Sequence, residues 1–175
     1  MQAARGASLT ATGQPGADRS RLGFIASIAV AAWSVDLVTK VLAVRELGDD
    51  PVKLVGSLLQ LHLTRNAGAA FSTGTSMTAA IALFGCVAFL GVCWLARRAR
   101  STAWAWALAL LLAGIAGNLT DRFFRDPGPL RGHVIDFLEL PHWPIFNVAD
   151  ICINVAAALI VIQSVRGVPL SGAKR

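Results

Sequence analysis

Four long apolar runs restrict the fold of this sequence more than any other feature. They cover roughly residues 22–44, 76–96, 102–123 and 146–165. Each is about 20 residues long, the length of helix that crosses a hydrocarbon core about 30 Å thick. Within lipid, a single segment can satisfy its own backbone hydrogen bonds only as a helix. The sequence therefore predicts an all-α polytopic membrane protein with four transmembrane helices.

The charge content agrees with a membrane protein. Charged residues make up 15% of the chain and hydrophobic residues 55%, whereas a soluble domain carries about 25% charged residues. The net charge of +6 could indicate a nucleic-acid partner. The basic residues flank the apolar runs, however, and do not gather on one polar face, which argues against that class of partner.

The distribution of arginine and lysine predicts the orientation. The short link between the second and third runs contains Arg97, Arg98 and Arg100, and both ends of the chain are also basic. The loops 45–75 and 124–145 mix both signs of charge. Because basic loops stay in the cytoplasm, we expect cytoplasmic termini and two outer loops.

Composition divides the chain into three parts. Residues 1–21 are rich in small and polar residues and are predicted to be a disordered cytoplasmic tail. Residues 22–165 form the membrane domain, and residues 166–175 form a second cytoplasmic tail. Apolar alternation around 59–63, followed by the turn-forming Asn66-Ala67-Gly68, predicts a small extracytoplasmic β-sheet.

Two charged residues lie inside the first run, Asp36 and Lys40. A charge near the bilayer centre costs about 2.5–3.5 kcal/mol, so it usually meets a partner. The i, i+4 spacing places both side chains on one helical face. An ion pair that only neutralises itself is one interpretation of this spacing, and support of a site is the other.

Polar residues also mark the outer ends of the third and fourth runs. Gly114, Asn118 and Arg122 form one helical stripe with Asp121 beside it. Asn147 and Asp150 share a face at the start of the last run, and Asp136 precedes them in the outer loop. With Asp36, these side chains reach one level just below the outer membrane surface, and this convergence predicts a site.

Two of these carboxyl groups, on Asp136 and Asp150, can perform hydrolysis if a tight return brings them together. Neighbouring carboxyl groups in a low-dielectric site share one proton. The ionised member can activate water while the protonated member polarises a peptide carbonyl. This chemistry needs neither metal nor cofactor, and the sequence contains no HExxH, GxSxG or phosphate-loop motif.

Five motifs occur in order: DLVTK (36–40), NAGAAF (66–71), AGIAGNLTDR (113–122), VIDF (134–137) and FNVAD (146–150). Together they resemble the bacterial lipoprotein signal peptidase family, also called signal peptidase II. The resemblance implies an intramembrane aspartic endopeptidase of the bacterial inner membrane, with its site near the outer face. Its substrates would be diacylglyceryl-modified prolipoproteins, cut before the lipidated cysteine, and the cyclic peptide globomycin would inhibit it.

The resemblance also implies roles for individual residues. Asp136 and Asp150 match the catalytic pair, and Asp121 matches a residue that stabilises the fold. The residues matching substrate-binding or supporting positions are Asp36, Lys40, Asn66, Gly114, Asn118, Arg122, Asn147 and Ala149. Leu37 and Ala113 depart from residues common in the family, which leaves the detailed fit of the substrate open.

Two other functions compete with this interpretation. A small transporter or proton relay would use Asp36, Asp121 and Asp150 as carriers and needs polar residues across the whole bilayer. A metal-dependent lipid phosphotransferase would use clustered aspartates and lose activity on chelation.

Overall fold

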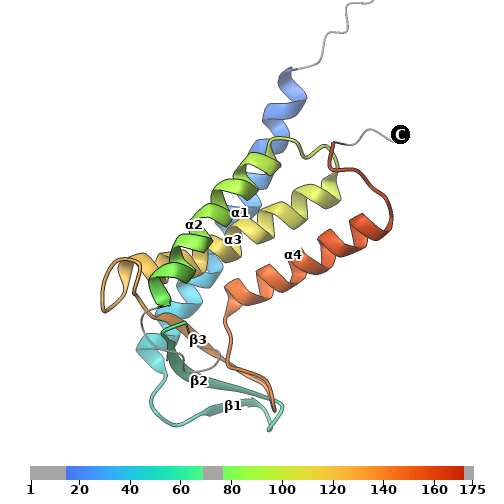
Figure 1. The fold of residues 1–175 in the computed structure, drawn as a ribbon. Coiled ribbons are helices and arrows are strands. Elements are labelled where there is room, and N and C mark those ends of the chain that lie inside the picture. Colours follow the sequence, from blue (N-terminus) through green and yellow to red (C-terminus); the bar gives the residue numbers. More distant parts are fainter. Residues whose placement is uncertain (1–14, 69–76, 172–175) are drawn as a thin grey trace, which may run out of the picture.

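The computed structural model describes residues 15–68 and 77–171. In these ranges the helices are α1 (Pro15–Glu46), α2 (Thr78–Ala96), α3 (Thr102–Phe124) and α4 (Val148–Val165), and the strands are β1 (Val52–Val55), β2 (Leu59–Asn66) and β3 (Val134–Glu139). The helices form a bundle, and the strands form a sheet at one end of it (Figure 1). The predicted fold class is confirmed.

All four helices contain a stretch long and apolar enough to cross a membrane. The prediction of the first helix was wrong at its start, because α1 begins at Pro15 and includes residues 15–21 of the expected tail. Hydropathy marks the part of a helix that lies in lipid, and a polar helix can continue beyond it. Proline also fits the first position of a helix. The other residues of that tail, 1–14, lie outside the described ranges, as do 172–175.

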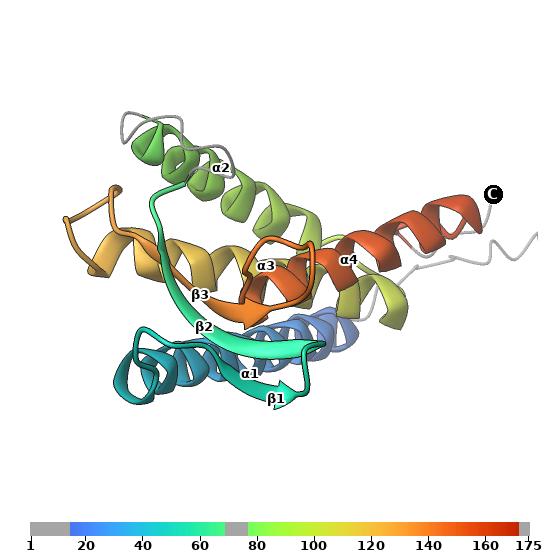
Figure 2. The ribbon, with the colours of Figure 1, turned by 90° about the horizontal axis from the view of Figure 1, so that it is seen from below.

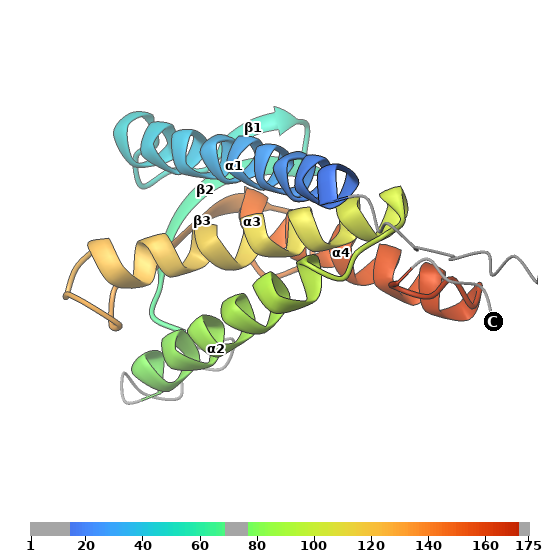
Figure 3. The same ribbon diagram turned by 90° about the horizontal axis from the view of Figure 1, so that it is seen from above.

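Helix α3 lies at the centre of the bundle, between α1 and α2 (Figure 3), and it packs against each of the other three helices. Most of its buried residues are small, alanine or glycine, including Ala105, Ala109 and Ala113. Small side chains let helix backbones approach closely in lipid, where apolar burial gives no advantage. Large apolar side chains such as Val87 and Leu90, which are 69% and 67% exposed, point outward, as expected of a surface that meets lipid.

The sheet crosses one end of the bundle (Figure 2). Its strand order is β1-β2-β3, with antiparallel pairs throughout. The register of β2 against β3 places Thr64 opposite Asp136. Ile135 and Phe137, on the other face of β3, pack in a cluster with Ala43 of α1. This cluster fixes the face of β3 on which Asp136 lies.

Residues after α4 return to the bundle. The Trp104 indole donates a 2.8 Å hydrogen bond to the carbonyl oxygen of Val168, and the backbone N–H of Arg100 donates to the carbonyl oxygen of Leu170. The first part of the expected C-terminal tail is therefore bound to the link between α2 and α3.

Candidate active site

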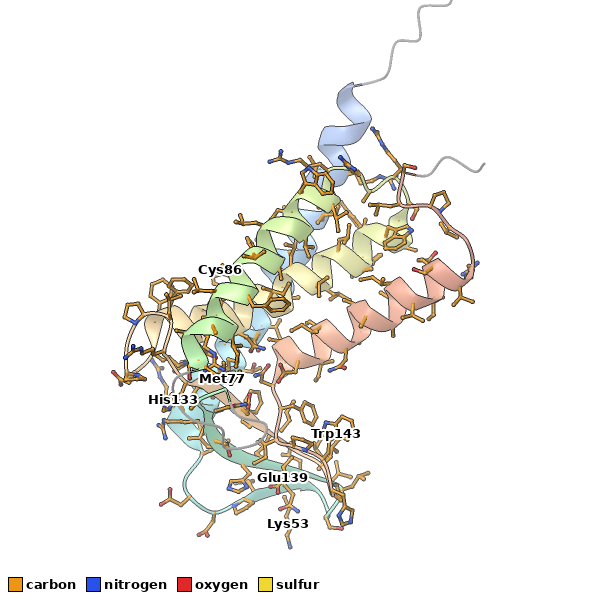
Figure 4. The ribbon with its side chains drawn as sticks, viewed as in Figure 1. Lys53, Met77, Cys86, His133, Glu139 and Trp143 are labelled. Carbon is orange, nitrogen blue, oxygen red and sulfur yellow. The ribbon has the colours of Figure 1, made fainter. Side chains whose placement is uncertain are left out.

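The polar residues that the sequence singled out meet at the sheet end of the bundle. They come from five elements that are distant in the chain: Asp36 and Lys40 from α1, Asn66 from β2, Gly114, Asn118, Asp121 and Arg122 from α3, Asp136 from β3, and Asn147, Ala149 and Asp150 at the start of α4. Figure 4 shows Met77, His133 and Glu139 at this end, with Cys86 part-way along α2. Contacts among these residues bring them together at this end of the bundle.

Asn147 connects the two aspartates of the expected pair. Its Nδ2 donates a 2.6 Å hydrogen bond to Asp136 Oδ1. Its Oδ1 accepts from the backbone N–H of Asp150 at 3.0 Å, and Asp150 Oδ2 accepts in return from the Asn147 N–H at 3.2 Å. This reciprocal capping box begins α4. The residue that caps the helix therefore also connects the two carboxyl groups, through its side chain to Asp136 and through its backbone N–H to Asp150.

The two carboxyl groups differ in their surroundings. Asp136 is 3% exposed, whereas Asp150 is half-buried in the first turn of α4. Burial raises the pKa of Asp136 to about 6, and the charge of Asp150 acts in the same direction, against hydrogen bonds from Asn66 and Asn147. Asp150 instead lies where the positive end of the helix dipole favours a carboxylate. The site therefore places one carboxyl group in a buried environment that favours its protonated form and the other at a half-exposed helix start.

A buried ion cluster lies next to the two aspartates. Lys40 Nζ lies 2.8 Å from Asp36 Oδ2 and 2.9 Å from Asp121 Oδ2, and both Lys40 and Asp36 are 1% exposed. Asp121 also pairs with Arg125 one turn later. Two cations thus compensate two anions, which a low-dielectric interior requires.

The same cluster holds the backbone next to both aspartates. Asp36 Oδ1 accepts from the N–H of Ala149 at 2.8 Å, and Asp121 Oδ2 accepts from the N–H of Ile135 at 3.2 Å. Ala149 directly precedes Asp150, and Ile135 directly precedes Asp136. Lys40 is therefore the common partner of the two side chains that position the pair.

Arg122 ties together the loops above the pair. Its guanidinium donates to the carbonyl oxygens of Asn66 at 3.2 Å and Gly132 at 3.0 Å. Asn66 in turn donates to Asp136 Oδ2 at 2.9 Å. The NAGAAF motif is thus connected to the site at its first residue, while residues 69–71 of that motif lie outside the described ranges.

Close approach of α3 to α4 explains the small residues of the third run. A Cβ at Gly114 would lie 2.5 Å from the carbonyl oxygen of Ala149 and 2.6 Å from Ile153 Cγ1. A Cβ at Gly117 would collide with Asp36 Oδ2. Both glycines let α4 approach α3 closely enough for Asn118 Nδ2 to donate to Asp150 Oδ1 at 2.9 Å.

An apolar groove of about 700 Å³ opens onto the pair. Asp136, Asp150, Asn66, Asn118 and Arg122 line its polar end. The rest follows α2 and α3 away from the sheet, lined by Ile81, Ala82, Phe84, Gly85, Ala88, Gly91, Val92, Trp94, Leu95, Leu111, Ile115, Leu119 and Ile153, with Val134 of β3. The arrangement can hold an apolar segment along the bundle while a peptide bond beside it meets two carboxyl groups.

Comparison with known proteins agrees with this geometry. A sequence model of the family described as Signal peptidase (SPase) II matches residues 28–166. The chain belongs to the signal peptidase II family. This peptidase is 47% identical over 148 residues to a lipoprotein signal peptidase of Mycobacterium tuberculosis, covering 84% of this chain and 73% of the relative. It is 46% identical over 157 residues to a lipoprotein signal peptidase of Leifsonia xyli, covering 88% and 72%.

A solved structure shares the fold of this peptidase. It is a bacterial membrane enzyme determined by the in meso method at 1.9 Å resolution, with a TM-score of 0.74 and 25% sequence identity. The similarity covers 82% of this chain and 94% of that one. The four-helix bundle with its terminal sheet is therefore an architecture also found by experiment.

Sequence reasoning missed two supporting residues of this peptidase. Gly132 leaves no room for a Cβ, which would lie 2.8 Å from the carbonyl oxygen of Arg125 and 3.0 Å from that of Arg122. Thr78 is buried and donates to the carbonyl oxygen of Ala67. Gly132 could have been noticed in the sequence, because it is a glycine shortly before Asp136. Thr78 could not, because a threonine at the start of a helix is common.

Proposed function

We propose that this signal peptidase II cleaves the signal peptide from diacylglyceryl-modified prolipoproteins just before the lipidated cysteine, using Asp136 and Asp150 as an aspartic pair. The observation that carries the proposal is the connection of two carboxyl groups of different burial through Asn147 at the mouth of an apolar groove. Relatives with the name lipoprotein signal peptidase support the choice of substrate.

In the proposed reaction, the ionised aspartate takes a proton from water as the water oxygen bonds to the scissile carbonyl carbon. The protonated aspartate gives its proton to the carbonyl oxygen. The diol then collapses: the C–N bond breaks, the first aspartate protonates the leaving nitrogen, and the second takes one hydroxyl proton. One water is consumed, and the pair again holds one proton.

The apolar lining of the groove suits the apolar signal segment of the proposed substrate. A signal segment that remains helical can lie along the apolar lining from α2 and α3, and its end then reaches the pair. The diacylglyceryl chains stay in the adjacent leaflet. Both apolar parts of the substrate therefore bring the peptide bond to the level of Asp150.

We also propose that the sheet end faces outward across the inner membrane. The arginine-rich link between α2 and α3 lies at the opposite end of the bundle (Figure 1), and basic links remain in the cytoplasm. Alkaline phosphatase fused after Gly48 should be active, and a fusion after Arg98 should be inactive. The reverse pattern would overturn this orientation.

The test of the cleavage proposal uses purified full-length protein with a lipid-modified precursor and an unmodified control. Wild type should cut only the modified precursor, and globomycin should inhibit it. Asp136→Asn and Asp150→Asn should abolish cleavage, while Asp49→Asn, at an exposed position, should cut like wild type. Wild-type turnover by either of the first two variants would reject the aspartic pair.

The rival functions give different results in the same assay. A transporter needs a polar path, but the groove beyond the pair is lined by apolar residues. In residues 15–68 and 77–171 no three His, Cys, Asp or Glu side chains are grouped to hold a metal ion. We expect EDTA to leave cleavage unchanged, and loss of activity on chelation would favour the metal-dependent phosphotransferase.

A further inference from the structure

Lys40 touches neither carboxyl group of the pair by any described hydrogen bond, yet its contacts lead to both. Its ammonium has three protons and no acceptor. Its three acceptors are Asp36 Oδ2 at 2.8 Å, Asp121 Oδ2 at 2.9 Å and Asn118 Oδ1 at 3.2 Å. All three ammonium protons therefore have an acceptor, and the third acceptor is the amide oxygen of Asn118.

The contact with Asn118 decides how that amide is turned. A nitrogen facing the Lys40 ammonium would bring two donors together, so Oδ1 must face the ammonium. Nδ2 then points the other way, and it donates to Asp150 Oδ1 at 2.9 Å. Asn118 Oδ1 also accepts from Asn147 Nδ2 at 3.3 Å, which strengthens the same orientation. A buried cation thus determines that Asp150 receives a donor.

We propose that Lys40 is a positioning residue of the reaction: acting through Asn118, it keeps Asp150 as the carboxylate that activates water and leaves the shared proton on Asp136. The inference rests on the proposed function. A hydrogen-bond donor aimed at a carboxylate stabilises its ionised form. Asp150 receives two such donors, from Asn118 and from the Asn147 backbone, in addition to the helix dipole at its position.

Burial assigns the proton to the other member. Asp136 also accepts two hydrogen bonds, but it is almost fully buried, and burial raises its pKa to about 6. The positive charge of Lys40 acts on Asp136 in the opposite direction. The charge of Lys40 alone would therefore not separate the two roles. The burial of Asp136 and the donor that Asn118 directs at Asp150 separate them together.

Several charged groups surround the pair and influence the pH at which the two aspartates gain or lose a proton. From the elements packed around Asp150 they are Asp36 and Lys40 of α1, Asp121 and Arg122 of α3, and Asp136 of β3. Lys40 could act on the pair by orienting the Asn118 amide or through its positive charge. These two effects change the pH profile of kcat/KM differently. Loss of the oriented donor moves the acid limb, which reports the base, while loss of charge alone moves the alkaline limb, which reports the acid.

The experiment compares pH profiles of lipid-modified precursor cleavage. Asn118→Leu keeps the three-residue ion cluster but removes the donor, and its acid limb should move up by about one pH unit. Asp36→Asn/Lys40→Met removes the ammonium without leaving an unpaired carboxylate, because Asp121 keeps Arg125. It should show the same shift, because the freed amide no longer has a fixed direction.

Combining the three substitutions should give no larger shift than Asn118→Leu alone, since residues in one chain of contacts are not additive. Asn154→Leu is the matched control, because within residues 15–68 and 77–171 the Asn154 side chain donates to the backbone oxygen of Asp150 and not to its carboxylate. Its pH profile should match that of wild type. Asp36→Asn alone should not move the acid limb upward.

If wild type is active and the acid limb of Asn118→Leu stays where it is in wild type, the inference is overturned and the proposed function stands. Additive shifts in the combined variant would also overturn the inference. If the double variant does not fold, as judged by thermal unfolding in detergent, Asn118→Leu decides. Absence of cleavage by wild type would instead reject the proposed function.

Discussion

Asn147 and Asp150 cap one another at the first turn of α4: the Asn147 side chain accepts from the Asp150 N–H at 3.0 Å, and the Asp150 carboxylate accepts from the Asn147 N–H at 3.2 Å. Helix capping of this kind needs a polar side chain at each of the two positions. Here one of the two also belongs to the proposed aspartic pair. The local structure of α4 and the proposed chemistry therefore depend on the same hydrogen bonds.

Replacing Asn147 should damage both properties together. Asn147→Ala removes the cap, which costs about 1 kcal/mol of stability, and it removes the 2.6 Å donor to Asp136. We expect cleavage to fall by about 100-fold, more than the loss of stability explains. Asn154→Ala, on the exposed face of α4, is the matched control. Equal activity of the two variants would contradict the role of Asn147, as measured with the modified precursor and by thermal unfolding.

A side chain at Gly114 should separate α3 from α4. In Gly114→Ala the new Cβ meets the Ala149 carbonyl oxygen and Ile153, so α4 must shift and Asn118 loses its hydrogen bond to Asp150. Overpacking of this kind costs about 1–3 kcal/mol. We expect a lower unfolding temperature and strongly reduced cleavage.

The control for this substitution is Gly23→Ala, because among the described residues no atom beyond its chain neighbours and its own helix backbone lies within 4 Å of a Cβ built there. Alanine favours helix over glycine, so this variant should be at least as stable as wild type. If Gly114→Ala were as active as wild type, the close approach of α3 and α4 would not be needed.

A large side chain in the groove should interfere with binding and leave the chemistry intact. Ala88 lines the groove, part-way along α2. Ala88→Trp should raise KM for the modified precursor about tenfold, with little change in kcat, because the pair is untouched. Val87→Trp adds the same side chain at a position that is 69% exposed and faces outward, and it should cut like wild type. Equal KM values for both variants would argue that the substrate binds elsewhere.

The burial of Asp136 predicts a contribution to stability that is present at acidic pH and lost at neutral pH. Its pKa rises from 3.8 to about 6 on folding, so the folded state holds the proton over a range in which the unfolded state has lost it. This contribution to stability is lost as pH rises from about 4 to about 6, and at 1.36 kcal/mol per pH unit it amounts to about 3 kcal/mol.

The measurement is the free energy of unfolding in detergent at pH 4 and at pH 7, for wild type and Asp136→Asn. Other groups titrate in both proteins, so the difference between them isolates residue 136. We expect the decrease with pH to be smaller in Asp136→Asn. Identical pH dependence in the two proteins would show that Asp136 is not held in a buried, proton-retaining state.

The sequence by itself determined the parts of this protein that depend on the solvent around each segment. Apolar runs long enough to cross a bilayer required helices, and three of the four runs both began and ended within two residues of the observed helices. Periodicity placed Gly114, Asn118 and Arg122 on one face of α3 for the same local reason. The start of α1 was missed, because hydropathy carries no information on a helix that continues into water.

Only the tertiary structure decided which of these residues act on one another. The i, i+4 spacing indicated that Lys40 can pair with Asp36. No pattern in the sequence indicates that Asp36 holds the N–H of Ala149, or that Lys40 also meets Asp121 and Asn118. These contacts join α1 to α3 and α4, and they arise because glycines let the helices approach closely. In a medium where every buried charge needs a partner, the packing of the helices selects that partner, and the partner in turn fixes the geometry of the two aspartates.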